Sequence, residues 1–102
     1  MIHVIAEINI NEGQREAFLR EFNEVVPLVL DEDGCIEYGA TIDARTELER
    51  QAPLRNDTVT IVEKWSGIEA LQAHLDSGHM AAYRERVKDH VAGATLRILE
   101  PA

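Results

Sequence analysis

The sequence predicts an α+β fold in which a four-stranded antiparallel sheet carries helices on one face. Four short segments alternate apolar and polar residues, as strands do, and the segments between them repeat apolar residues at helical spacing. These elements follow one another in the order β-α-β-β-α-β, which is the ferredoxin-like arrangement. At 102 residues the chain is long enough for one core, and we expect a single domain over residues 1–102.

The first strand is expected over residues 2–10, which are rich in isoleucine and valine and have one fully apolar face. Asn11 then matches a helix N-cap, with Gln14 three positions later as in a capping box, so a helix should begin here. It should run to about Glu32, before Asp33-Gly34 stops it. The acidic run D-E-D-G, residues 31–34, is interpreted as a solvated helix end. Its buried face is predicted to carry Phe18, Phe22, Val25 and Val29.

Residues 35–43 and 58–65 alternate again and are predicted as the second and third strands. Residues 46–57 join them; they are charged, contain Pro53 and should form an exposed connection. In the second strand, alternation puts four residues on one face: Ile36, Tyr38, Ala40 and Ile42. In the third strand, the residues that share a face are Val59, Ile61, Glu63 and Trp65.

The second helical segment is predicted in two pieces. Ser66 is expected to cap a helix over residues 67–75, and Ser77-Gly78 interrupts the helical pattern. A helix resumes over residues 79–91 until Gly93 stops it. The chain then alternates as a final strand, residues 94–100.

The sheet face without helices is also expected to be covered. Its side chains are too mixed for a core and too apolar for free solvent; they include His3, Ile5, Glu7, Thr60 and Val62. A small domain leaves apolar surface that a second copy of itself can bury. We therefore expect a homodimer in which two sheets join as a dimeric α/β barrel.

Charge and composition exclude several classes of partner. The chain has 10 Lys and Arg against 19 Asp and Glu, a formal net charge of −9, which disfavours binding to nucleic acid. No apolar run approaches the roughly 20 residues that span a bilayer, and the N-terminus lacks a signal-peptide pattern. We expect a soluble cytoplasmic protein with no membrane partner. The one cysteine, Cys35, indicates neither a redox pair nor a metal cage.

His74 and His79 stand on either side of the Ser-Gly break, in the segment AHLDSGHM, at the borders of the apolar helix faces. A histidine at such a border can be partly desolvated, which places its pKa where it can act as an acid or a base. The plain alternative is two junction residues that bond to backbone or water. A separation of five positions between the two histidines matches no standard spacing of helical metal ligands, so no metal is expected.

Four further side chains are candidates for a binding site. Trp65 could form a wall for a flat aromatic ligand, or simply fill the core. Tyr38 and Tyr83 could donate hydrogen bonds to a ligand oxygen, or to a backbone carbonyl. Arg84 lies near the apolar stripe of its helix, where a snorkelling arginine is common and an anionic partner is the alternative.

Two patterns carry a resemblance to a known family. The more specific is W-x(5)-L-x-x-H-L-x(3)-H-M-x-x-Y from Trp65 to Tyr83, and E-D-G-C-x-x-Y from Glu32 to Tyr38 supports it. With these patterns the chain resembles the antibiotic-biosynthesis-monooxygenase (ABM) domain family, most of all its small bacterial quinol monooxygenases. The resemblance spans nearly the whole chain, apart from residues 44–57.

The resemblance implies a homodimer of ferredoxin-like subunits with a pocket for an aromatic polyphenol or quinol between each sheet and its helices. Better-known family members oxygenate such substrates with O₂ and without flavin, haem or metal. A relative degrades haem through an Asn, a Trp and a His; the matching positions here are Ile8, His74 and Arg84. A haem function is therefore not expected.

Together these observations predict a cofactor-independent monooxygenase that oxidises a quinol or similar polyphenol with O₂. His74 or His79 would be the general base, because a hydroquinone reacts with O₂ much faster as its anion. The other expected contacts are the hydrogen-bonding Tyr38 and Tyr83, the wall Trp65 and the phenolate stabiliser Arg84. Two alternatives stay open: an isomerase or degrading enzyme for a small hydroxylated carbonyl signal molecule, and a non-catalytic dimer that binds quinones or other aromatics.

Overall fold

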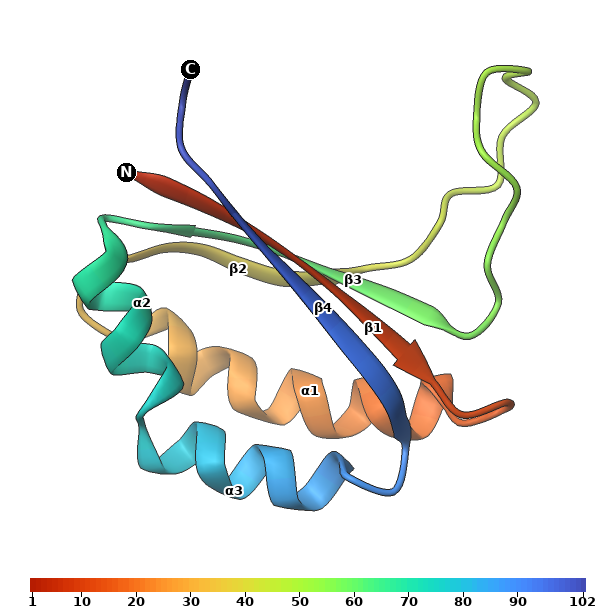
Figure 1. The fold of residues 1–102 in the computed structure, drawn as a ribbon. Helices are drawn as coiled ribbons and strands as arrows, with labels where there is room; N and C mark the ends of the chain where they lie inside the picture. Colours follow the sequence, from red (N-terminus) through yellow and green to blue (C-terminus); the bar gives the residue numbers. More distant parts are fainter.

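The computed structural model describes residues 1–102 as a ferredoxin-like α+β fold (Figure 1). The elements are β1 (Ile2–Ile10), α1 (Arg15–Leu30), β2 (Cys35–Thr41), β3 (Thr58–Trp65), α2 (Ile68–Leu75), α3 (Gly78–Val87) and β4 (Val91–Leu99). The four strands pair antiparallel in the order β2-β3-β1-β4. All three helices lie on one face of this sheet, so the predicted fold class is confirmed.

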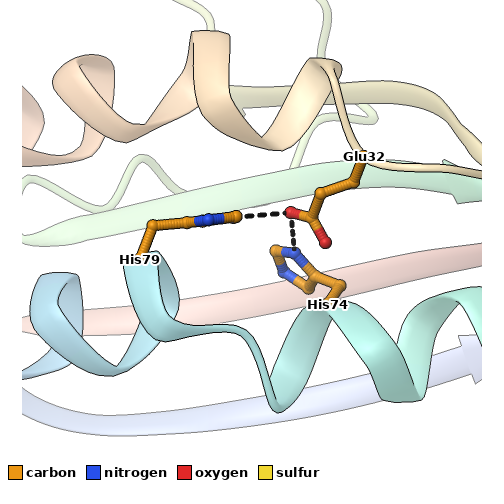
Figure 2. Close-up of side chains that lie close together, drawn as sticks. All are labelled: Glu32, His74 and His79. Carbon is orange, nitrogen blue, oxygen red and sulfur yellow. Dashed lines mark hydrogen bonds and ion pairs between the residues drawn. The ribbon is translucent and has the colours of Figure 1, made fainter.

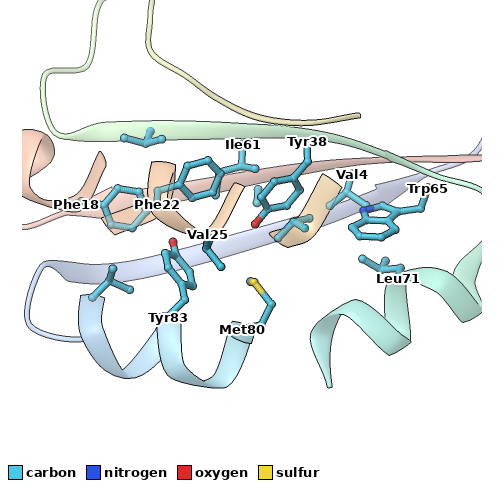
Figure 3. Close-up of a cluster of buried hydrophobic side chains, with 14 of the residues drawn as sticks. Val4, Phe18, Phe22, Val25, Tyr38, Ile61, Trp65, Leu71, Met80 and Tyr83 are labelled. Carbon is cyan, nitrogen blue, oxygen red and sulfur yellow. The ribbon is translucent and has the colours of Figure 1, made fainter. Parts of the chain in front are cut away.

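The core lies between the sheet and the helices (Figure 3). The predicted face of α1 is buried in full, and so is the predicted face of β3, which includes Glu63. On β1 the alternation is also confirmed, with Ile2, Val4, Ala6 and Ile10 buried. Stacked and edge-on aromatic rings fill the centre of this core, where Phe22 lies 5.3 Å from Tyr38 and 6.0 Å from Tyr83 between ring centroids.

The predicted start of α1 is wrong by several residues. The helix begins at Arg15, with Gln14 in the N-cap position and no side-chain cap. The capping box does not form because its side chains have partners elsewhere in the chain: Asn11 donates to the Asp89 carbonyl, and the Gln14 side chain bonds to the His90 ring. Such long-range partners are invisible to a local pattern.

The limits of the second helical segment also differ from the prediction. Gly67, not Ser66, occupies the N-cap position of α2, and its extended backbone carries no side-chain cap. At the other end, α3 stops at Val87, and Val91 already pairs with Ile10 as part of β4. Residues 88–90 form a turn, and pairing with β1 takes Val91, which helical spacing had assigned to the helix; Gly93 lies inside this strand.

The alternation predicted for β2 is interrupted at its start. The register with β3 shifts between Cys35 and Glu37, so that Cys35 lies opposite Trp65 while Tyr38 lies opposite Glu63. Two residues of β2 thus match one of β3, as in a β-bulge. Tyr38 is buried as predicted, whereas Ile36, expected on the same face, is 56% exposed.

The sheet face that points away from the helices, here called the uncovered face, carries no other element of the chain (Figure 1). Its central side chains Ile5 and Val62 lie opposite each other on β1 and β3 and are half-buried. On edge strand β4, Leu99 lies opposite His3 on this face and is about half-exposed. Leu96 and Ile98 are also about half-exposed, but they lie opposite Ala6 and Val4 on the helix side of the sheet. None of the helices is long and apolar enough to cross a membrane.

Candidate active site

A cavity of about 430 Å³ lies between the sheet and the helices and is lined mostly by apolar side chains. All four strands and all three helices contribute to its wall. A volume of this size falls in the range of small-molecule sites, which are mostly apolar with a few placed polar groups. The polar residues that line it are Tyr38, Glu63, His74, Tyr83, Arg84 and Lys88.

His74 lies in the last turn of α2 and is only 2% exposed. Its Nδ1 atom is 2.9 Å from Oε2 of Glu32 (Figure 2). The other ring nitrogen, Nε2, has no protein partner. Since every fully buried side-chain polar atom in the structure has a partner, Nε2 is not fully buried. Because His74 lines the cavity, Nε2 is the ring nitrogen that a ligand there can reach.

His79 lies in the first turn of α3 and bonds to the same carboxylate oxygen. Its Nε2 atom is 2.9 Å from Oε2 of Glu32, so one oxygen serves two imidazole rings (Figure 2). The break between the helices produces this arrangement: the Ser77 hydroxyl donates to the His74 carbonyl and accepts from the Met80 backbone N–H. His79 itself does not line the cavity.

Glu32 was missed as a site residue, and its interpretation as a solvated helix end is wrong, because its side chain is only 14% exposed. The turn after α1 carries it over the junction of α2 and α3. At Gly34 the backbone has φ +81°, and a Cβ there would lie 2.5 Å from Oγ of Ser66 and 2.6 Å from Cβ of Ala70. Only glycine permits this close approach. The E-D-G-C pattern was the available signal.

The protonation of His74 follows from its surroundings. Burial lowers the pKa of His74 below its ordinary value and outweighs the hydrogen bond to Glu32, which acts to raise it. In the neutral ring, an Nδ1–H that donates to Glu32 leaves Nε2 as the acceptor. The structure therefore presents a proton-accepting nitrogen to the cavity.

Glu63 is a second site residue to which the sequence assigned no role. It lines the cavity, is 5% exposed, and its Oε1 accepts a hydrogen bond of 2.8 Å from the Trp65 indole N–H. Burial raises the pKa of Glu63 to about 7, although the bond from Trp65 acts to lower it. Near neutral pH this carboxyl group holds a proton that an exposed glutamate would have lost.

Tyr38 and Tyr83 are buried and line the cavity, and neither hydroxyl has a protein partner (Figure 3). Every fully buried side-chain polar atom has a partner, so these two hydroxyls are not fully buried and open onto the cavity. Burial raises the pKa of both tyrosines above the ordinary value, so both stay protonated as hydrogen-bond donors.

Trp65 and Arg84 are placed differently from one another. Trp65 is fully buried and does not line the cavity; its ring packs on His74, with 4.6 Å between centroids, so it lies behind the wall instead of forming it. Arg84 does line the cavity, and its guanidinium donates a hydrogen bond of 2.8 Å to the Leu75 carbonyl. The structure thus brings Tyr38, His74, Tyr83 and Arg84 to one cavity.

Two imidazoles and a carboxylate are also a donor set that could hold a divalent metal ion. The ligand atoms of Glu32, His74 and His79 lie within 4.8 Å of one another. The spacing argument against a metal considered only the two histidines and did not foresee the carboxylate. Both nitrogen atoms lie at hydrogen-bond distance from Oε2, so in this arrangement the carboxylate is the partner of each ring.

The comparisons with known proteins agree with the resemblance read from the two patterns. Residues 1–86 match the family model described as antibiotic biosynthesis monooxygenase. The chain belongs to the antibiotic biosynthesis monooxygenase family. A relative in Escherichia coli K12, named "Probable quinol monooxygenase YgiN", is 41% identical over 103 residues, which cover 99% of this chain and 98% of the relative. Family membership and this relative support a monooxygenase-type function.

Solved structures share the fold. PA3566 from Pseudomonas aeruginosa superimposes with a TM-score of 0.81 at 21% identity and covers 99% of this chain and 93% of its own. A conserved protein from Methanosarcina mazei Go1 gives a TM-score of 0.83 at 19% identity, with 99% and 92% covered. At these identities the likeness establishes the architecture, and the function must be argued from the site.

Proposed function

We propose that this protein is a cofactor-independent monooxygenase that transfers one oxygen atom of O₂ to a quinol or similar polyphenol, with His74 as the general base. One observation carries the proposal: the Glu32–His74 pair presents the free Nε2 of His74 to an apolar cavity. The name of the Escherichia coli relative, a probable quinol monooxygenase, supports the substrate class.

The cavity suits a phenolic ring. Its apolar walls would bind the faces of the ring, and a cavity of about 430 Å³ is within the range of small-molecule sites. The hydroxyls of Tyr38 and Tyr83 would donate hydrogen bonds to ring oxygens. Arg84 adds one cation at the cavity wall, which would stabilise a phenolate.

The reaction needs a base and no further reductant. His74 Nε2 takes a phenolic proton, and the hydrogen bond from Nδ1 to Glu32 stabilises the resulting imidazolium. The phenolate then gives electrons to O₂ more readily than the neutral quinol does. One oxygen atom replaces a ring hydrogen, the other leaves as water, and the quinol becomes a hydroxyquinone, so that the ring supplies all four electrons that reduce O₂.

His79 has a different part in this proposal. It donates to Glu32 but does not line the cavity, so it is a positioning residue that acts through the carboxylate. Loss of a base that touches the substrate should lower kcat more than loss of a residue that acts through another side chain.

We also infer that the protein is a homodimer whose uncovered faces pack together as a dimeric α/β barrel. The half-buried Ile5 and Val62 at the centre of this face and the exposed Leu99 of β4, which lies opposite His3, support the inference. A contiguous exposed apolar patch on a small protein marks an interaction surface. Single-domain organisation and a cytoplasmic location stay predictions from the sequence.

The proposal is tested by O₂ uptake with a chemically reduced quinone such as menadiol. His74→Gln should lower kcat on the order of 100-fold or more, the usual contribution of a general base, with the fold retained. His79→Gln should lower it much less, while His90→Gln, whose ring bonds to Gln14 outside the cavity, serves as the matched control. Equal losses in the first two variants would contradict the assignment of His74.

The same assay under nitrogen separates the alternatives. A monooxygenase is silent without O₂, whereas an isomerase for a small hydroxylated carbonyl compound turns over unchanged. Menadione binding without any product, followed by mass spectrometry, would instead indicate a binding protein.

A further inference from the structure

Reduction of O₂ at the ring requires an acid as well as a base, because the oxygen atom that leaves as water must be protonated. We propose that Glu63 is this acid, a second catalytic residue that faces the substrate from the sheet while His74 faces it from α2. The inference rests on the proposed function and adds a named proton donor to it.

The placement of Glu63 supports this role. It lies on β3 with its side chain toward the helices, opposite Val4 on β1 and Tyr38 on β2. Its Oε1 is occupied by the Trp65 indole N–H, which fixes the orientation of the carboxyl group. Oε2 has no protein partner and is not fully buried. Because Glu63 lines the cavity, Oε2 is the oxygen that a ligand there can contact.

The surroundings of Glu63 favour its protonated form. β1 presents the apolar Val4, β2 presents Tyr38, and the helices present His74 and Tyr83. Arg84 and Lys88 also line the cavity, but neither forms an ion pair with Glu63: Arg84 bonds to the Leu75 carbonyl and Lys88 pairs with Glu85. The negative charge of Glu32 acts further against ionisation. A buried carboxyl group without a cationic partner keeps its proton.

His74 and Glu63 thus form a pair whose surroundings act in opposite directions. The imidazole is held neutral, as a base, and the carboxyl group is held neutral, as an acid. Two titratable groups in one cavity that are perturbed in this way indicate an acid and base assignment.

The proton balance closes with these two groups. His74 takes a phenolic proton, a C–O bond forms between the ring carbon and O₂, and His74 returns its proton to give the ring hydroperoxide. Glu63 then protonates the distal oxygen as the O–O bond breaks and water leaves. The hydrogen on the same ring carbon is lost as a proton to the Glu63 carboxylate, which restores the acid and leaves a carbonyl.

Glu63→Gln tests the proposal, since a glutamine oxygen still accepts from Trp65 but the side chain cannot supply a proton. In the wild type kcat should fall as pH rises above about 7, where Glu63 loses its proton. In Glu63→Gln, kcat should drop on the order of 100-fold with KM little changed, and the basic limb should disappear. Glu69→Gln, an exposed carboxylate on the same helix as His74, is the control.

Menadione binding gives a second readout that needs no turnover. Trp65 is the only tryptophan, and its fluorescence should report both the ligand and the protonation of Glu63. Menadione should bind the wild type several-fold more weakly at pH 8 than at pH 6, because the protonated carboxyl donates to a quinone carbonyl. Glu63→Gln should bind equally at both values.

The outcomes separate the two proposals. Wild-type kcat with an intact basic limb in Glu63→Gln, or menadione binding by the wild type that is the same at pH 6 and pH 8, overturns the assignment of Glu63. If menadione binding depends on pH through Glu63 but no quinol is oxidised, Glu63 is supported as the proton donor of the cavity and only the oxygenase proposal fails.

Discussion

A single carboxylate oxygen in this chain accepts hydrogen bonds from two imidazole rings, and only one of these rings reaches the cavity. In the proposed mechanism, Glu32 would have the role that an aspartate has beside the histidine of a hydrolase triad: it would fix the tautomer and stabilise the cation that forms. His79 holds Glu32 from the other side. The proposed difference between the two histidines thus depends on their ring nitrogens: Nδ1 of His74 bonds to Glu32 and leaves Nε2 for the cavity, whereas His79 bonds to Glu32 through Nε2 and does not line the cavity.

At the residue scale, the pH dependence of folding should reveal Glu63. Between its ordinary pKa of 4.5 and its folded value of about 7, the folded protein keeps a proton that the unfolded chain releases. The unfolded state binds fewer protons, so stability falls as pH rises through this window, by about 3 kcal/mol at about 1.4 kcal/mol for each tenfold change in proton affinity.

Urea unfolding of the wild type and Glu63→Gln at pH 4.5 and pH 8 measures this contribution. His74, whose pKa is lowered, acts in the opposite direction below pH 6.5, and it is common to both proteins, so the difference between them isolates Glu63. The free energy of unfolding of Glu63→Gln should rise relative to the wild type by about 3 kcal/mol between the two pH values. A constant difference would show that folding does not raise the pKa of Glu63.

At the scale of elements, the site depends on two junctions. The break between α2 and α3, held by Ser77, turns His74 and His79 toward one point. The turn between α1 and β2 brings Glu32 to that point, and the Ser66 backbone N–H donates to the Gly34 carbonyl at 2.8 Å across this contact. The turn after α1 and the adjoining ends of α2 and α3 therefore meet at the Glu32 carboxylate.

Gly34→Ala should damage this contact. The added methyl group would meet Ser66 and Ala70 at distances far below van der Waals contact, and the residue would keep a positive φ. We expect a loss of about 3 kcal/mol in the free energy of unfolding, measured by urea denaturation. Gly78→Ala is the matched control: it begins α3 with nothing within 4 Å of its Cβ, so its stability should be unchanged or slightly higher.

At the scale of the whole molecule, the sheet has one face in the core and one uncovered face. The side chains of the uncovered face combine apolar residues with both signs of charge, including an ion pair between Lys64 and Glu37. A surface of mixed sign can meet its own copy even though each chain carries a net charge of −9.

Light scattering after size exclusion tests the proposed dimer. The expected mass is about 23 kDa, twice the 11.5 kDa of one chain. Val62→Lys places a charge at the centre of the uncovered face and should shift the mass toward one chain, because a buried unpaired charge is costly. Ile68→Lys changes an exposed apolar residue of α2 and should leave the dimer intact. A monomeric wild type would contradict the proposal.

The fold could be predicted because its signals are local. Apolar residues at periods of two and of about 3.6 mark strands and helices, and the buried faces of α1 and β3 match those periods residue by residue. The boundaries were less predictable where long-range pairing competed with local preference, as at Asn11, Ser66 and Val91. The bulge at Cys35 likewise depends on the pairing of β2 with β3, and no residue pattern within β2 predicts it.

The sequence by itself determined the order of the elements, the core faces and the family, because these follow from periodicity and from residues close together in the chain. Only the tertiary structure decided the chemistry of the site. Glu32 lies 42 residues from His74 along the chain, and burial is the main cause that raises the pKa of Glu63 to about 7. Both effects depend on distance and solvent access in three dimensions, and neither quantity is written in the spacing of residues.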